Sequence, residues 1–135
     1  MSEPEIRSVA TAQLTVGESD LASAVGLEKS DDFPRVFATA RLVALMEVAA
    51  ARLLRPHLRD GESSVGVSVD ILHTAPTPMR GTVVATATYM GRDGKLFLFE
   101  VLAADDAGEV GRGTHKRAVI SKDRLIADAA KRLKS

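Results

Sequence analysis

The stretch VFATARLVALMEVAAARLLRPHL, residues 36–58, decides the fold because it is the only long helical run rich in alanine and leucine. Its apolar side chains cover far more than one narrow stripe of a helical wheel. A helix that is apolar on so many sides is buried in a protein core. The sequence therefore predicts a long central helix around which the rest of the chain packs.

Glu47 lies on an apolar face of this predicted helix, roughly 100° or more away from the edge that carries Arg41 and Arg52. An ionised carboxylate among apolar neighbours is costly unless it has a partner. We therefore expect Glu47 to be paired, hydrogen-bonded or held neutral, which makes it the first catalytic candidate. The ordinary alternative is a glutamate that reaches water or pairs with an arginine at the edge of the core.

Five segments have the β-branched and aromatic composition of strands. In chain order they are residues 10–16, 64–74, 81–90, 96–103 and 110–120. The last four are separated by PTPMR, GRDGK and DDAGE, which are suited to hairpin turns, so we expect a mostly antiparallel meander. Residues 17–35 are too long for a plain connection and are expected to form a lid, and residues 121–135 a surface helix capped by Ser121.

A sheet that follows a broadly apolar helix can bury it only by curling around it. The predicted fold class is therefore α+β, a hotdog fold in a single domain over residues 1–135. One sheet on one helix leaves an open sheet edge and an uncovered part of the helix. We expect a homodimer, and dimers that pair further into a higher oligomer remain an open alternative.

The composition excludes several classes of function. The chain has 18 basic and 18 acidic residues with no basic tract, and only 4% of its residues are aromatic, so we expect neither nucleic-acid nor membrane partners. Cysteine is absent and the three histidines share no ligand spacing, so we expect no metal. No signal peptide or membrane span is visible, which favours a cytoplasmic protein.

Four further residues are candidates for chemistry. His73 ends a predicted strand just before two prolines, and Thr39 lies near the start of the long helix, where backbone amides are unpaired. Gly66 interrupts a β-branched strand, which indicates the close approach of a ligand or of the helix. Arg117 faces the same side as Val119 and should therefore need a carboxylate or an anionic ligand as partner. Gly111 and Gly113 are expected to bulge the same strand.

Thr39 and Glu47 are eight residues apart, which is roughly 12 Å along one straight helix. They cannot touch within one regular helix. Either the helix begins after Thr39 and the preceding chain folds back, or the site combines residues from two subunits.

The blocks VFAT, LME, HTAPTP and GTHKRAVI, in this order and spacing, resemble the fluoroacetyl-CoA thioesterase family of the hotdog superfamily. The similarity runs from about residue 33 to residue 120. It implies hydrolysis of a short acyl-CoA by a catalytic group that corresponds to Thr39, Glu47 and His73. Because CoA is part of the substrate, no cofactor is expected.

The resemblance also implies three substrate-binding positions. Gly66 would hold the thioester carbonyl through its backbone, Arg117 would line the site, and Phe33 would be a lid phenylalanine. The fluoroacetyl-selective member has a second lid phenylalanine where this chain has Ser30. Fluoroacetyl selectivity is therefore not carried over, and another small acyl-CoA is an alternative substrate.

We expect His73 to polarise or deprotonate the attacking group, with Glu47 or Thr39 as nucleophile or as holder of a water molecule. Backbone amides near Gly66 would stabilise the oxyanion. Two other functions fit the same fold: hydration or dehydration of an acyl-CoA, and a non-catalytic dimer that binds an acyl-CoA or another small ligand.

Overall fold

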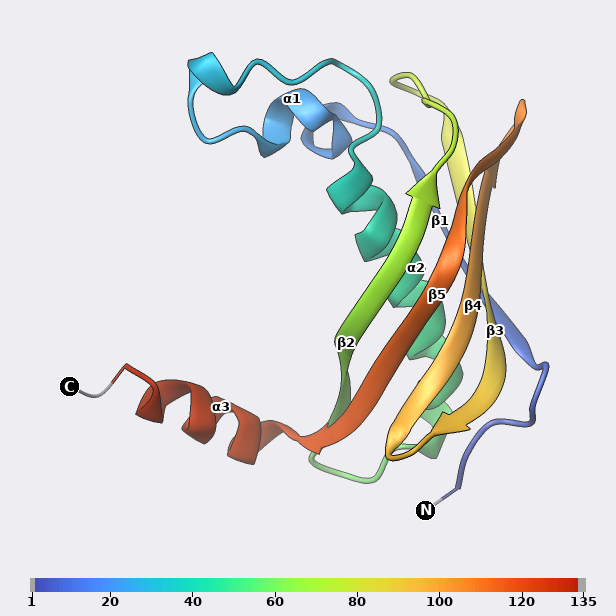
Figure 1. The fold of residues 1–135 in the computed structure, drawn as a ribbon, viewed down its shortest axis with the longest axis vertical. Coiled ribbons are helices and arrows are strands. Elements are labelled where there is room, and N and C mark those ends of the chain that lie inside the picture. The colour runs from blue at the N-terminus through green and yellow to red at the C-terminus, as the bar shows by residue number, and fades with distance from the viewer. Residues whose placement is uncertain (1, 134–135) are drawn as a thin grey trace.

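The computed structural model describes residues 2–133, in which a five-stranded antiparallel sheet curls around a long helix (Figure 1). The helix, α2, spans Thr39–Leu54. The strands are β1 Val9–Thr15, β2 Glu62–His73, β3 Thr82–Asp93, β4 Leu96–Asp105 and β5 Gly108–Ser121. This is the α+β hotdog arrangement that the sequence predicts.

The core lies between α2 and the concave face of the sheet. Every second residue of β3 and of the first part of β4 points to the helix, as expected for half-buried strands. The helix contributes its own buried face. The largest buried side chains of this core are Leu21, Phe37, Leu42, Met46, Leu54, Tyr89, Phe97 and Phe99.

The opposite side of α2 is left uncovered within one protomer. Val48 is 41% exposed, and Ala40 is exposed as well. The sheet thus buries only one face of a helix that the sequence predicts to be buried nearly all round. An apolar helix face without a cover is what the sequence analysis expects of a protein that pairs with a second copy.

The strand order is β1-β3-β4-β5-β2, which corrects the expected meander. β2 pairs with β5, and the PTPMR segment is not a hairpin turn. This segment carries the chain from one edge of the sheet toward the other. Thr77 is fully buried there, its hydroxyl donates to the Asp105 carboxylate at 2.7 Å, and its carbonyl accepts from the Phe37 amide at 2.9 Å.

The central helix begins at Thr39, three residues later than the predicted residue 36, and is followed by a 3-10 turn at Arg55–His57. The Ala38 amide donates to the Asp20 carbonyl at 2.9 Å, so the preceding segment is held extended. Residues 17–35, the segment expected to form a lid, contain short helical turns at Glu18–Asp20, Ala22–Val25 (α1) and Lys29–Asp31. The lid lies over the N-terminal end of α2 (Figure 1).

The C-terminal helix, α3, spans Lys122–Lys131 and is capped by Ser121, whose hydroxyl accepts from the Arg124 amide. Residues 134 and 135 of the expected helix lie outside the described residues. Instead of lying along the surface, α3 extends away from the sheet (Figure 1), and none of its residues is buried. Within residues 2–133, no helix is both long and apolar enough to cross a membrane.

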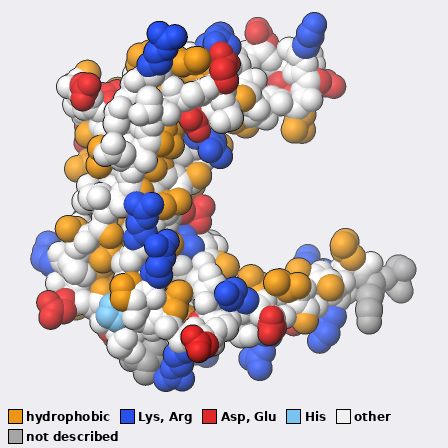
Figure 2. All heavy atoms as spheres, turned by 180° about the vertical axis from the view of Figure 1, so that it is seen from behind, with side chains coloured by type: hydrophobic (Ala, Val, Ile, Leu, Met, Phe, Trp, Pro, Cys, Tyr) orange, Lys and Arg blue, Asp and Glu red, His pale blue; other side chains and the backbone are white. Residues whose placement is uncertain are grey.

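A deep hollow separates the lid from α3 (Figure 2). Hydrophobic side chains on α3 face this hollow, and exposed apolar residues of the helix include Leu125 and Ile126. The strand β2 is the edge of the sheet on this side, and its residues 66–70 are exposed.

Candidate active site

Thr39 and His73 meet where the start of α2 lies beside the end of β2. Thr39 is the first residue of the helix, and its Oγ1 lies 2.8 Å from His73 Nδ1 in a hydrogen bond. The Phe37 ring packs edge-on against the imidazole, with centroids 6.4 Å apart. Ala38 occupies the N-cap position of the helix, so the Thr39 hydroxyl is available to the histidine.

The second ring nitrogen of His73, Nε2, is buried and has no hydrogen-bond partner within residues 2–133. Burial lowers the pKa of His73 below its usual value of 6.5, because desolvation disfavours the imidazolium. A neutral histidine with one anchored nitrogen and one free nitrogen is suited to proton transfer.

An open cleft of about 460 Å³ borders this pair. Phe33, 48% exposed, lies in its wall together with Thr39 and His73, as the sequence predicts for a lid phenylalanine. The remaining lining residues are Ala22, Pro34, Val36, Phe37, Thr74, Ala75 and Pro76. A larger hollow of about 590 Å³ lies on the outer face of the sheet, but none of the candidate residues lines it. We therefore assign the site to the smaller cleft.

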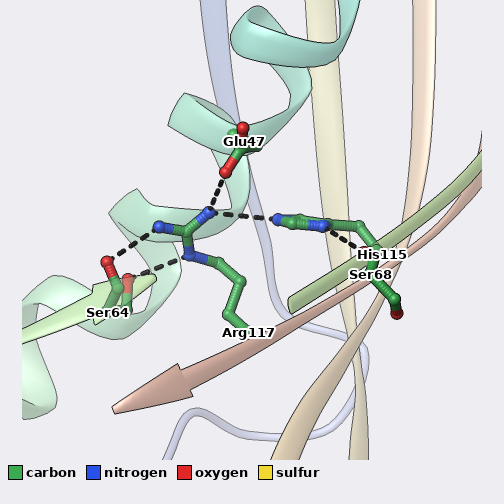
Figure 3. A network of polar contacts seen from close by, with 5 residues as sticks. All are labelled: Glu47, Ser64, Ser68, His115 and Arg117. Carbon is green, nitrogen blue, oxygen red and sulfur yellow. Dashed lines mark hydrogen bonds and ion pairs between the residues drawn. The ribbon is translucent and has the colours of Figure 1, made fainter. Parts of the chain in front are cut away.

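Glu47 and Arg117 form a second group farther along α2 (Figure 3). Arg117 Nη1 donates to Glu47 Oε2 at 3.0 Å. Arg117 is only 6% exposed, whereas the Glu47 side chain keeps 38% of its surface accessible. Arg117 is thus the partner that Glu47 needs, and Glu47 is the carboxylate that Arg117 needs. One side of the Glu47 carboxylate remains accessible to solvent.

Two residues that the sequence analysis did not single out hold Arg117 in place. Ser64 accepts from Arg117 Nε through its hydroxyl and from Nη2 through its carbonyl, both at 2.9 Å. His115 Nε2 lies 3.1 Å from Arg117 Nη1, and His115 Nδ1 lies 2.9 Å from the Ser68 carbonyl (Figure 3). The alternation that turns Arg117 inward also turns His115 inward, so the signal for His115 was present in the sequence.

The hydrogen bonds of His115 fix its charge and tautomer. A carbonyl can only accept, so Nδ1 carries the proton toward Ser68 and Nε2 accepts from Arg117. Burial is the main cause that lowers the pKa of His115 below 6.5, and the Arg117 charge acts in the same direction. His115 is therefore a neutral side chain that accepts a hydrogen bond from Arg117.

Gly66 provides the close approach that its position predicts. A Cβ built on this residue would collide with Glu47 Oε2 and would lie 3.3 Å from His115 Cε1. The β2–β5 pairing shifts register between Gly66 and Ser68. The expected bulge at Gly111 lies one residue earlier, because the shift in the β4–β5 pairing leaves Val110 as the extra residue.

The candidate residues thus form two groups, and no hydrogen bond within residues 2–133 joins them. Phe33, Thr39 and His73 lie at the cleft, whereas Glu47, Gly66 and Arg117 lie farther along α2. Because Thr39 is already part of α2, the alternative in which the helix begins after it is wrong.

Comparisons with known proteins give two sequence matches. Residues 16–123 match the family model described as fluoroacetyl-CoA-specific thioesterase. A curated fluoroacetyl-CoA thioesterase of Streptantibioticus cattleyicolor is 43% identical over 96 residues, which cover 71% of this chain and 69% of that protein.

Solved structures of similar proteins share the fold of this chain. A structure of a fluoroacetyl-CoA thioesterase is 32% identical, covers 98% of this chain and 100% of its own, and superposes with a TM-score of 0.92. A hot-dog-like protein from Thermanaerovibrio acidaminovorans, 24% identical, covers 97% of this chain and 94% of its own with a TM-score of 0.82. The second likeness shows the fold alone.

Proposed function

The chain belongs to the fluoroacetyl-CoA-specific thioesterase family, and from this premise we propose that it is a thioester hydrolase that cleaves a short-chain acyl-CoA into the free acid and CoA. The observation that carries the proposal is the Thr39–His73 hydrogen bond of 2.8 Å at the wall of an open cleft. A neutral histidine held by a hydroxyl beside a substrate-sized cleft is a constellation for acyl transfer.

The substrate class follows from the cleft. Its wall is mainly apolar and includes Ala22 and Phe33, which suits a small acyl group better than a charged one. The lid tip, by contrast, is polar, because Ser30 is exposed and its hydroxyl donates to Glu28 at 2.9 Å. We therefore propose short acyl chains as a class, with no selectivity for fluoroacetyl-CoA.

The proposed mechanism gives each group one role. His73 polarises or deprotonates the attacking group, and Glu47 or Thr39 acts as nucleophile or holds the attacking water. In either case the carbon–sulfur bond breaks, CoA leaves as the thiol after protonation, and one water is consumed. The pairing of β2 with β5 shifts register between Gly66 and Ser68, and a backbone amide left unpaired at this irregularity is the proposed donor to the oxyanion.

We further propose that the working unit is a homodimer with two shared sites. An antiparallel pairing of β2 with its own copy, centred near Val69, sets the partner's His73 opposite residues 65–66, beside Glu47. Val69 is 40% exposed and Val48 is 41% exposed, so the faces that this pairing would cover are apolar. The arrangement brings the two groups of site residues together. A CoA thioester as substrate fits the cytoplasmic location that the sequence predicts.

The proposal is tested by following CoA thiol release from acetyl-, fluoroacetyl-, propionyl- and medium-chain acyl-CoA. We expect the shortest chains to have the highest kcat/KM. Hydration of an enoyl-CoA without thiol release would instead support a hydratase. Tight binding of every acyl-CoA without turnover would support a non-catalytic binding dimer, and either result would overturn the thioesterase assignment.

A further inference from the structure

His115 is a deeply buried titratable group that the proposed mechanism does not use. It is 1% exposed, lies two residues from Arg117 on the same strand, and faces α2. Its ring also packs against Phe99, with centroids 6.3 Å apart. Both of its nitrogens are hydrogen-bonded.

The guanidinium of Arg117 is held from three sides. Ser64 accepts from Nε and from Nη2, and His115 Nε2 accepts from Nη1. The second hydrogen on Nη1 is directed to Glu47 Oε2. Because the two hydrogens of a planar NH₂ group point in fixed directions, the acceptor of one hydrogen determines where the other points. His115 thus aims the remaining hydrogen at the carboxylate.

The orientation of the His115 ring is set in turn by the edge strand β2. Ser68 lies where the β2–β5 register shifts, and its carbonyl accepts from His115 Nδ1. The same irregularity contains Gly66, which leaves room for Glu47. The bulge therefore has two effects: it presents the Ser68 carbonyl to His115, and it leaves space at Gly66 for the Glu47 carboxylate.

A cation-binding role for these residues is inconsistent with the geometry. The Arg117 guanidinium lies between the imidazole and the carboxylate and occupies the His115 Nε2 lone pair (Figure 3). A metal ion at the same place would meet a fixed positive charge.

We infer that His115 is a positioning residue of the reaction, which acts through Arg117 to hold Glu47 beside Gly66. This inference rests on the proposed function only for its effect on turnover. The geometric part, that His115 sets the Arg117–Glu47 contact, stands independently of the substrate.

Two substitutions test the roles of the two ring nitrogens of His115 separately. In His115→Gln the side-chain oxygen reaches the place of Nε2 and still accepts from Arg117. In His115→Asn the side-chain amide takes the place of Nδ1, so the bond to Ser68 is kept and the acceptor for Arg117 is lost. Thr114→Val, on the exposed outer face of the same strand, is the matched control.

We expect kcat for thioester hydrolysis to fall about 10- to 100-fold in His115→Asn, the size of a lost hydrogen bond to a charged group. KM should change less than about twofold, because the substrate does not touch His115. His115→Gln should keep kcat within about threefold of the control. Equal losses of kcat in the two variants, or losses that follow their melting temperatures, would overturn the positioning role.

Crystal structures of both variants test the geometric part without any substrate. We expect the contact between Arg117 Nη1 and Glu47 Oε2 to be kept in His115→Gln and lengthened or broken in His115→Asn. An unchanged contact in His115→Asn would overturn the inference. If the wild-type protein hydrolyses no thioester while the contact changes as expected, the proposed function fails and the positioning of Glu47 by His115 stands.

Discussion

The two groups of site residues differ in how completely one protomer holds them. At the carboxylate end, Glu47 faces an arginine that is 6% exposed and makes four hydrogen bonds. At the histidine end, His73 is held by one hydrogen bond to Thr39, and its Nε2 has no partner within residues 2–133. The first group is positioned before any substrate or second subunit arrives, whereas the second is open to both.

This contrast separates the effects of substitutions. A change at the carboxylate end should alter chemistry through the position or charge of one fixed group. A change at the histidine end should alter both proton transfer and what the dimer contributes.

The largest effect is expected for Glu47→Gln. The amide oxygen still accepts from Arg117, so the fold should be kept, but the negative charge that attacks or activates water is lost. We expect kcat for thiol release to fall about 10³-fold, within the range for loss of a general base or nucleophile. Glu100→Gln, on the exposed outer face of β4, is the control and should remain within about twofold. Retained activity in Glu47→Gln would remove Glu47 from the mechanism.

The second prediction tests whether the two ends belong to different subunits. His73→Ala and Glu47→Gln should each be inactive alone. Mixed after unfolding and refolding together, they should regain about a quarter of wild-type activity, because half of the dimers are mixed and one of their two sites is intact. If both residues served one protomer's site, every site would carry a defect. No recovery in a mixture shown to contain mixed dimers would contradict the shared site.

The third prediction concerns Gly66→Ala. The new Cβ meets the far end of the Glu47 side chain, which can rotate away, so the clash itself should cost little. Loss of the contact with the buried Arg117 should lower the free energy of unfolding by about 1.5–3 kcal/mol. The rotation moves the carboxylate away from Arg117, and kcat should fall about tenfold or more. Thermal unfolding and thiol release on the same preparation measure both quantities. A large loss of stability with unchanged turnover would show that Gly66 serves packing alone.

The central helix, the antiparallel strands and the inward turn of Arg117 were all predictable, because each follows from a local period of 3.6 or 2 residues. The strand order was not. PTPMR has the residues of a hairpin turn, yet β2 pairs with β5, and this choice depends on buried contacts of Thr77 far from it in sequence. The start of α2 was missed for the same reason, since backbone hydrogen bonds from the lid decide it.

Within the site, the sequence indicated that Glu47 needs a partner, with an arginine as one alternative, and that a ligand or the helix approaches Gly66 closely. The contacts of Ser64 and His115 with Arg117 were not predicted, because strand alternation turns His115 inward but does not identify hydrogen-bond partners. The residues of a site can thus be found by strand alternation, whereas the hydrogen bonds among them require the three-dimensional structure.

The smallest effect is a pH dependence of stability that also separates the two ends. The pKa values of His73 and His115 are both lowered below 6.5 in the folded protein, chiefly by burial. The unfolded chain therefore binds these protons more readily, so their contribution to stability is complete above pH 6.5. It is lost as pH falls from 6.5 through the folded pKa values, by at most about 1.4 kcal/mol per pH unit for each histidine. Asp105 and Asp93, whose pKa values are lowered from 3.8, act only at lower pH.

Urea unfolding between pH 5 and pH 7 measures this slope. We expect His115→Gln to flatten it more than His73→Gln, because His115 is enclosed on both ring nitrogens and cannot relax toward water, whereas His73 borders an open cleft. Comparing slopes removes any constant loss of stability that the substitutions cause. A larger flattening in His73→Gln would mean that the histidine end is the more enclosed of the two, which would reverse the contrast between the pre-positioned carboxylate and the open imidazole.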